Sequence, residues 1–240
     1  CEYGGDKGIF GFGYTDANTD ITNLVSNSGV VASDVSGVGT ARRQVSACSY
    51  GGDKGIFGFG TTGSITGVTN LVNSSGVVAS DVSAVGTARA NLAATEYGED
   101  KGIFAYGHNG SAYVDESNLV SNVGVVATDV TGVGTDRGYL GGCSYGTDKA
   151  IFGYGNTAGG DVSVTNLVSN TGVIGTDVSG VGTARQGLAA TQYGGDKGIF
   201  GYGNPSYVSM TNLVTNAGVV GSDVSGVGTG RSELDACSFG

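Results

Sequence analysis

The sequence predicts an all-β protein, a five-bladed β-propeller with four antiparallel strands in each blade. The first observation is a unit of about 47 residues that occurs five times, a period typical of propellers and solenoids. The second is the alternation of residue types over short stretches, which indicates strands. The third is glycine, 48 of 240 residues, which recurs at turn positions. One aromatic residue opens the Gly-rich turn of every unit: Tyr3, Tyr50, Tyr97, Tyr145, Tyr193 and, after the fifth unit, Phe239.

The second unit shows the expected elements in order. Residues 45–50 alternate and predict a first strand, and the tight turn 51–54 leads to a second strand at 55–59. A polar loop at 60–67 precedes a third strand at 68–72. The hairpin turn 73–76 ends in Gly76, where a positive φ is wanted, and a fourth strand follows at 77–82. No stretch has helical periodicity.

The chain is expected to form a single domain, residues 1–240, with its blades at 1–41, 42–88, 89–136, 137–184 and 185–230. Residues 231–240 supply a closing strand. We expect its core, 234–239, to pair within the first blade, to close the ring and to displace residues 1–3, because a joined seam protects sheet edges. A Cys1–Cys237 disulfide is an alternative if the two ends lie close together.

Composition excludes several classes of function. The formal net charge is −10, which argues against nucleic acid, because phosphates require a basic patch. No apolar run approaches the ~18 residues of a membrane span, so no membrane insertion is expected. Cys-x-x-Cys spacing is absent, and neither a metal nor a cofactor is predicted. We expect a monomer; an extracellular or virion-associated setting is one alternative for its location.

The order of elements resembles a known family. Arg89 is followed by a hydrophobic first strand, and the second strand of each unit ends in a pattern such as Phe57-Gly58-Phe59-Gly60. This order is similar to kelch-type propeller repeats over all five units, and to repeats of phage and environmental proteins labelled kelch-like. The kelch double glycine is Gly-x-Gly here, and the kelch Trp is missing. The resemblance implies a propeller and a phage-associated or environmental origin.

Length varies in one place only. The third-strand Asn lies 19 residues before the Arg in every unit, whereas the second-strand Ile lies 14, 14, 15, 15 and 13 residues before that Asn. The loop between strands two and three, and the stretch after the Arg, are therefore predicted to form one variable face that binds ligand. The alternative is that these loops vary only because they tolerate changes of sequence and length. The candidate ligand-binding residues are Tyr14, Asp16, Asn18, His108, Asn109, Tyr113, Asn156, Asn204 and Tyr207.

An Asp and an Arg recur in every unit, with the Arg eight residues after the Asp. We interpret them as a structural set that holds each connection between blades; five equivalent ligand sites are the alternative. The set is Asp34, Arg42, Asp81, Arg89, Asp129, Arg137, Asp177, Arg185, Asp223 and Arg231.

No arrangement of a nucleophile with its base, or of paired carboxylates, is evident among the unrepeated residues, so no catalytic residue is predicted. The sequence favours a non-enzymatic binding module that recognises carbohydrate or a surface protein, with several equivalent sites as one version. The alternative is a structural scaffold, either a phage particle component or an engineered repeat protein, without a small-molecule ligand.

Overall fold

The computed structural model describes residues 1–238 of the chain, and it is all-β: no helix occurs among these residues. Each unit contributes one antiparallel three-stranded sheet, and a two-stranded hairpin is inserted in the fourth unit. The strands, unit by unit, are β1 (Glu2–Tyr3), β2 (Lys7–Tyr14), β3 (Asn18–Val25); β4 (Ser46–Tyr50), β5 (Lys54–Gly58), β6 (Thr69–Val72); β7 (Ala93–Tyr97), β8 (Lys101–Ala105), β9 (Ser117–Val120); β10 (Gly141–Tyr145), β11 (Lys149–Gly153), β14 (Thr165–Val168); β15 (Ala189–Tyr193), β16 (Lys197–Gly203), β17 (Val208–Val214); the hairpin is β12 (Asn156–Thr157) with β13 (Gly160–Asp161).

The predicted fourth strand is not a regular strand in the described chain. In the second unit its residues touch β6 only through two isolated bridges, Thr69 with Val82 and Val72 with Val78. Between these bridges the side chain of Asn70 donates to the Ala79 carbonyl at 3.1 Å. A side-chain amide thus replaces a backbone partner, which interrupts the ladder. The prediction of four strands per unit was therefore wrong. Each unit has three strands and a fourth segment that contacts the third strand through isolated β-bridges.

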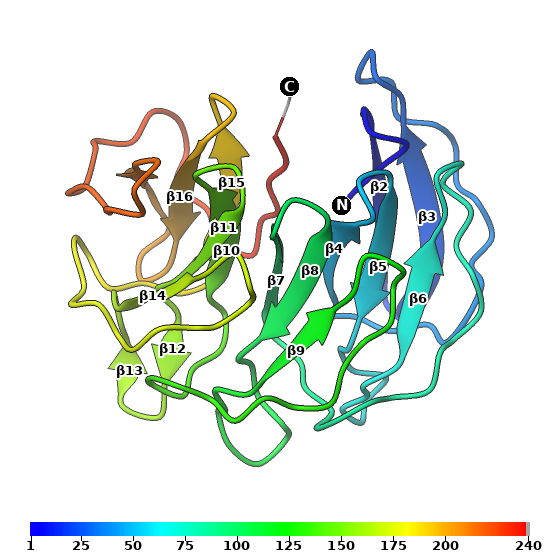
Figure 1. Cartoon of the computed structure of the whole chain (residues 1–240), viewed down its shortest axis with the longest axis horizontal. Coiled ribbons are helices and arrows are strands. Elements are labelled where there is room, and N and C mark those ends of the chain that lie inside the picture. Colours follow the sequence, from blue (N-terminus) through cyan, green and yellow to red (C-terminus); the bar gives the residue numbers. More distant parts are fainter. Residues whose placement is uncertain (239–240) are drawn as a thin grey trace.

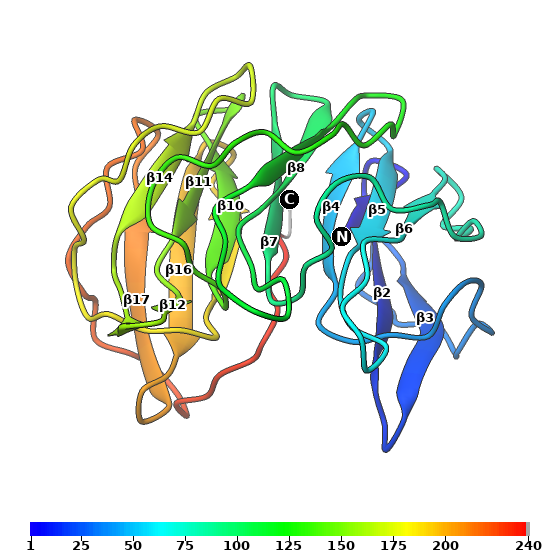
Figure 2. The same cartoon turned by 90° about the horizontal axis from the view of Figure 1, so that it is seen from below.

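The five sheets follow one another in an arc, with the first strands β4, β7, β10 and β15 toward its inner side (Figure 1). Successive sheets pack face to face through aromatic pairs, such as Phe59 with Phe104 at 5.1 Å between ring centroids. Small residues make this approach feasible: a Cβ on Gly58 would lie 2.8 Å from Phe104 Cζ. The view from below shows the same stacking of sheets (Figure 2).

The prediction that a C-terminal strand pairs in the first unit and displaces residues 1–3 is wrong for the described residues. Glu2 and Tyr3 themselves pair with β2, opposite Gly8 and Lys7, whereas residues 231–238 form no strand; Phe239 lies outside the described residues. A tight turn joins β1 to β2, so this pairing closes a far shorter loop than pairing by the other end of the chain. Cys1 and Cys237 are both free thiols, without the alternative disulfide.

A buried arginine joins each pair of successive units. Arg42 lies over the ring of Phe12 in the first sheet at 4.1 Å and donates from Nη2 to Asn70 Oδ1 in the second sheet at 2.7 Å. The same contacts recur at the next three junctions, where the guanidinium lies 4.0 to 4.7 Å from the ring centroid. The side chains concerned are 0% exposed: Arg42, Arg89, Arg137 and Arg185.

The aspartate of each junction comes from the following unit. Asp81, not Asp34, lies near Arg42, with Asp81 Oδ1 4.0 Å from Nη1. Thr40 donates its N–H at 3.1 Å and its hydroxyl at 2.6 Å to the Asp81 carboxylate. Burial acts to raise the pKa of Asp81, but the hydrogen bonds from Thr40 and Asn70 and the charge of Arg42 together hold it below its usual range.

The aromatic residue under each arginine has an unusual backbone. Phe12 and Tyr202 have φ of 63° and 65°, at a point where the register between the second and third strands shifts. A left-handed aromatic residue costs on the order of 1–3 kcal/mol. The bulge turns the ring out of the strand's alternation and places it beneath the guanidinium, which explains the Gly-x-Gly pattern around it.

Candidate functional site

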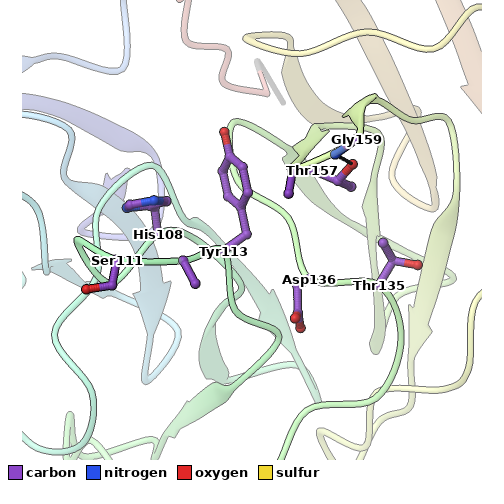
Figure 3. A pocket seen from close by; sticks show the side chains of 9 residues that line it. His108, Ser111, Tyr113, Thr135, Asp136, Thr157 and Gly159 are labelled. Atoms are coloured by element: carbon purple, nitrogen blue, oxygen red, sulfur yellow. Dashed lines mark hydrogen bonds between the residues drawn. The ribbon is translucent and has the colours of Figure 1, made fainter.

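A cavity of about 480 Å³ lies between the third and fourth units, among the variable loops (Figure 3). It opens between the loop after β8, the junction segment before Arg137, and the β12–β13 hairpin. The variable loop between strands two and three thus contributes from two successive units, whereas the variable stretch after Arg137 does not line the cavity. The lining residues are His108, Ser111, Ala112, Tyr113, Thr135, Asp136, Thr157, Ala158 and Gly159.

Two aromatic rings form one wall of the cavity. His108 and Tyr113 meet edge to face, with centroids 5.1 Å apart and planes at 84°, a favoured geometry for such a pair. Tyr113 donates its hydroxyl to Asn156 Oδ1 at 2.8 Å. A Cβ at Gly138 would lie 3.0 Å from Tyr113 Cε1, so the glycine leaves room for the ring. The orientation of Tyr113 is therefore set by groups of the fourth unit.

The polar groups of the cavity divide into engaged and available ones. The hydroxyl of Thr135 donates to Asp177 at 2.6 Å, and that of Thr157 donates to Gly160 O at 2.9 Å. His108 Nδ1 accepts from the N–H of Gly110 at 3.0 Å, so the neutral ring carries its proton on Nε2. The lining contains one carboxylate, Asp136, and neither Lys nor Arg. The cavity lining therefore includes aromatic rings, an N–H donor and a carboxylate.

A second carboxylate lies behind Asp136. Burial, followed by the nearby charge of Asp136, raises the pKa of Asp115. Asp115 packs on the backbone at Gly132, where a Cβ would collide with its carboxylate. Glu116, the next residue, has a buried Oε2 without a hydrogen-bond partner. The acidic character of this corner disfavours an anionic ligand and favours one that donates hydrogen bonds.

Three of the nine predicted ligand-binding residues come together here. His108 and Tyr113 line the cavity, and Asn156 holds Tyr113. Asn109 instead shapes its loop, accepting from the N–H groups of Ser111 and Ala112.

The remaining five lie in the loops of the first and fifth units, away from the cavity. Tyr14 lies under Arg43, with the guanidinium 4.6 Å from the ring centroid, and Asn18 Oδ1 is buried without a partner. Asn204 donates to Ser232 at 3.0 Å, and Tyr207 is 64% exposed. Asp16 has a left-handed φ of 69° at the hairpin tip. Among residues 1–238 no group of three or more His, Cys, Asp or Glu side chains could hold a metal ion.

Asp136 is the main residue that the sequence analysis missed. It precedes the junction Arg137, and the same position holds Ala41, Ala88 and Ala184 in other units. Comparison of the units at this position would have found it, because a carboxylate replaces a methyl group at one junction only. Asp136 lies in the segment that is most regular between units, outside the loop whose length varies.

The sequence matches no protein-family model and no curated protein. The residues that the structure describes include no helix long and apolar enough to cross a membrane.

Proposed function

We propose that this protein is a non-enzymatic binding module that holds a neutral carbohydrate in the cavity between its third and fourth units. One observation carries the proposal: Tyr113 and Asp136 line the same open cavity. A ligand with an apolar face and several hydroxyl groups matches this pairing of surfaces. The C–H face of a sugar packs on the ring, and its hydroxyls donate to the carboxylate in short, charge-assisted hydrogen bonds.

The proposal places one site on each chain rather than several equivalent ones. Asp136 has an alanine or glycine counterpart at the other junctions, such as Ala88 and Gly230. His108 corresponds to Thr61 in the second unit and to Asn204 in the fifth. The scaffold repeats, but the donor and acceptor set does not, so avidity within a single chain is not part of the proposal.

The test is a glycan array with the purified chain, followed by titration calorimetry with the strongest glycan. Tyr113→Ala and Asp136→Ala should each weaken binding about tenfold or more, as expected for central contacts. Tyr113→Phe keeps the ring, loses the bond to Asn156 and should cost only a few fold. Asp136→Ala restores the residue found at three other junctions, so loss of folding is not expected.

Tyr207→Ala is the matched control, because Tyr207 is an exposed tyrosine in the corresponding loop of the fifth unit and does not line the cavity. It should bind like the unmodified chain. Absence of binding to every glycan, or equal losses for Tyr207→Ala and Tyr113→Ala, would contradict the proposal.

The second candidate is a structural scaffold without a small-molecule ligand. The four buried Arg–Asn contacts, repeated with nearly constant geometry, favour it, because they serve packing rather than recognition. In both cases we propose that the five sheets are blades of a β-propeller of the kelch-like type, open between the fifth sheet and the first. The repeat period and the face-to-face packing of successive sheets support this proposal.

A further inference from the structure

The C-terminal segment begins a new junction after the fifth sheet. Glu233 has a φ of 55°, the left-handed conformation that Asn91 and Tyr139 have at the same position of earlier units. Its N–H donates to Gly187 O at 2.8 Å, as the N–H of Gly187 donates to Tyr139 O at 2.9 Å. The chain after Arg231 therefore follows the path of a sixth unit.

Ser238 of that segment lies beside the first strand of the chain. Ser238 donates to Glu2 Oε1 at 2.8 Å. Ser144 donates in the same way to Gln192 at 2.8 Å, between the neighbouring first strands β10 and β15. Residue 238 thus occupies the place next to β1, and in Figure 1 the C-terminal segment runs between β15 and β2. Among residues 1–238, this place in the arc contains a first-strand segment and no second to fourth strand.

The fifth sheet presents one half of a junction toward this place. Arg231 lies over the ring of Tyr202 at 4.2 Å, as its counterparts do over theirs. Among the described residues its side chain donates only to Thr229 O, at 3.2 Å, and Arg231 is exposed. The four corresponding arginines are fully buried. Arg231 is oriented for an Asn and an Asp of a following sheet.

The first sheet presents the other half. Phe10 is 53% exposed, whereas the rings at the same position of the other four sheets are at most 3% exposed. Asn23 donates to Asp34 Oδ1 at 2.8 Å, the arrangement found at complete junctions between Asn70 and Asp81. Within residues 1–238 no arginine or threonine side chain reaches this pair, unlike at the four complete junctions.

We propose that the place between the fifth and first sheets is a docking site for one more sheet of this same repeat. The donated sheet consists of strands two to four, and the segment that contains Ser238 serves as its first strand. On one side its Asn and Asp receive Arg231 and Thr229. On the other side its own Thr and Arg reach Asp34 and Asn23, and its second-strand aromatic residue covers Phe10.

The geometry favours this occupant over two others. The first sheet of the same chain is not the next sheet, because Ser238 lies beside Glu2 and not in its position. A whole second copy would bring its own second sheet into the space of the first sheet, since successive sheets follow the arc. A single donated sheet satisfies both exposed faces, and completion of a sheet by a donated segment is an established mode of recognition.

The test adds a synthetic peptide of residues 51–89, one unit without its first strand, to the intact chain. Native mass spectrometry should show one peptide per chain, and the melting temperature should rise with peptide concentration, because binding only to the folded state stabilises it. Arg231→Met in the chain, or Asn70→Ala with Asp81→Ala in the peptide, should weaken binding by about tenfold or more. The peptide with Asp53→Ala carries the same charge change as Asp81→Ala at a turn, and should bind like the original.

A fusion provides a second measurement that does not depend on peptide solubility. Residues 52–89 appended after Gly240 should raise the melting temperature, and the same fusion with alanines in place of the donated Asn and Asp should not. Three results would overturn the proposal: no stabilisation by either peptide or fusion, binding unaffected by Arg231→Met, or a chain that is already a dimer through these faces at micromolar concentration.

Discussion

Replacement of Arg89 by methionine tests whether the buried arginines hold successive units together. Arg89 is 0% exposed, and it donates to Asn118 Oδ1 at 2.6 Å and to Thr87 O at 3.1 Å. Its Nη1 lies 3.5 Å from Asp129 Oδ1. Methionine keeps an unbranched aliphatic side chain but removes the guanidinium that lies over Phe59, with its charge and all its donors. The substitution therefore isolates the polar contribution of this junction.

The expected loss can be bounded from these contacts. Removing one partner of a buried ion pair typically costs about 3–5 kcal/mol, because the other charge is left uncompensated. The Asp129 side chain is 26% exposed and keeps donors from Asn118 and Thr87. Water and these donors continue to stabilise the carboxylate, which places the loss at the lower end, about 3 kcal/mol. The equilibrium between folded and unfolded chain should thus shift by about two orders of magnitude.

Urea denaturation followed by far-ultraviolet circular dichroism measures this loss, since the chain has no Trp. Arg231→Met is the matched control, because Arg231 has the same position in the repeat but is exposed, and its side chain donates only to Thr229 O among the described residues. Its free energy of unfolding should change by no more than about 0.5 kcal/mol. A loss below about 1 kcal/mol for Arg89→Met, or equal losses for both variants, would refute the structural role assigned to the junction.

Three further predictions follow from packing and charge. Gly153→Ala should destabilise the chain by about 1–2 kcal/mol, because a Cβ there would lie 2.9 Å from Phe200 Cζ. Gly201→Ala should have little effect, because only Thr211 Cγ2, at 3.4 Å, lies near its Cβ. Thermal melts compare the two variants, and equal losses of stability would contradict the packing described here. In the native protein a thiol reagent should modify the exposed Cys237 quickly. It should modify Cys48 and Cys143 slowly, because these two thiols are buried and burial raises the pKa of Cys143 to about 12. Equal rates for all four thiols would contradict this prediction. Stability should be retained near neutral pH and fall as the pH drops below the ordinary carboxyl pKa of about 4. The reason is that the folded state lowers the pKa of four junction carboxylates, so that their protonation favours unfolding: Asp81, Asp129, Asp177 and Asp223. Thermal melts at acid pH measure this loss, and a constant melting temperature down to pH 2 would exclude it.

Much of the secondary structure can be read from local patterns. The alternation in residues 45–50 corresponds to β4, and Thr69–Val72 falls within the predicted third strand. Lys54–Gly58 overlaps the second strand predicted at 55–59 but starts and ends one residue earlier. The prediction of a fourth strand was wrong because the Asn70 side chain donates to the Ala79 carbonyl, which a regular strand would use as a backbone acceptor. Hydrophobic alternation reports which residues suit a strand, but not whether a side chain competes with the backbone for the same partner.

The candidate site was only half predictable for a similar reason. His108 and Tyr113 were identified because they lie in the loop that varies in length between units. Asp136 lies 23 residues beyond Tyr113 in the sequence, and it joins them only because the connection between the third and fourth sheets passes beside the loop. Unit-by-unit comparison can find an unusual residue, but its neighbours depend on how the sheets stack.

By itself the sequence determined that the protein is all-β, that it repeats a unit of about 47 residues, and where the turns and most of the strands lie. These features arise from interactions between residues close in the chain, and the period records them directly. Only the tertiary structure decided that Arg42 meets Asp81 and not Asp34, and that Glu2 and Tyr3, and not residues 234–238, pair with β2 in the first sheet. Both outcomes depend on which surfaces come together between units, where identical repeats offer several equivalent partners and packing geometry selects one.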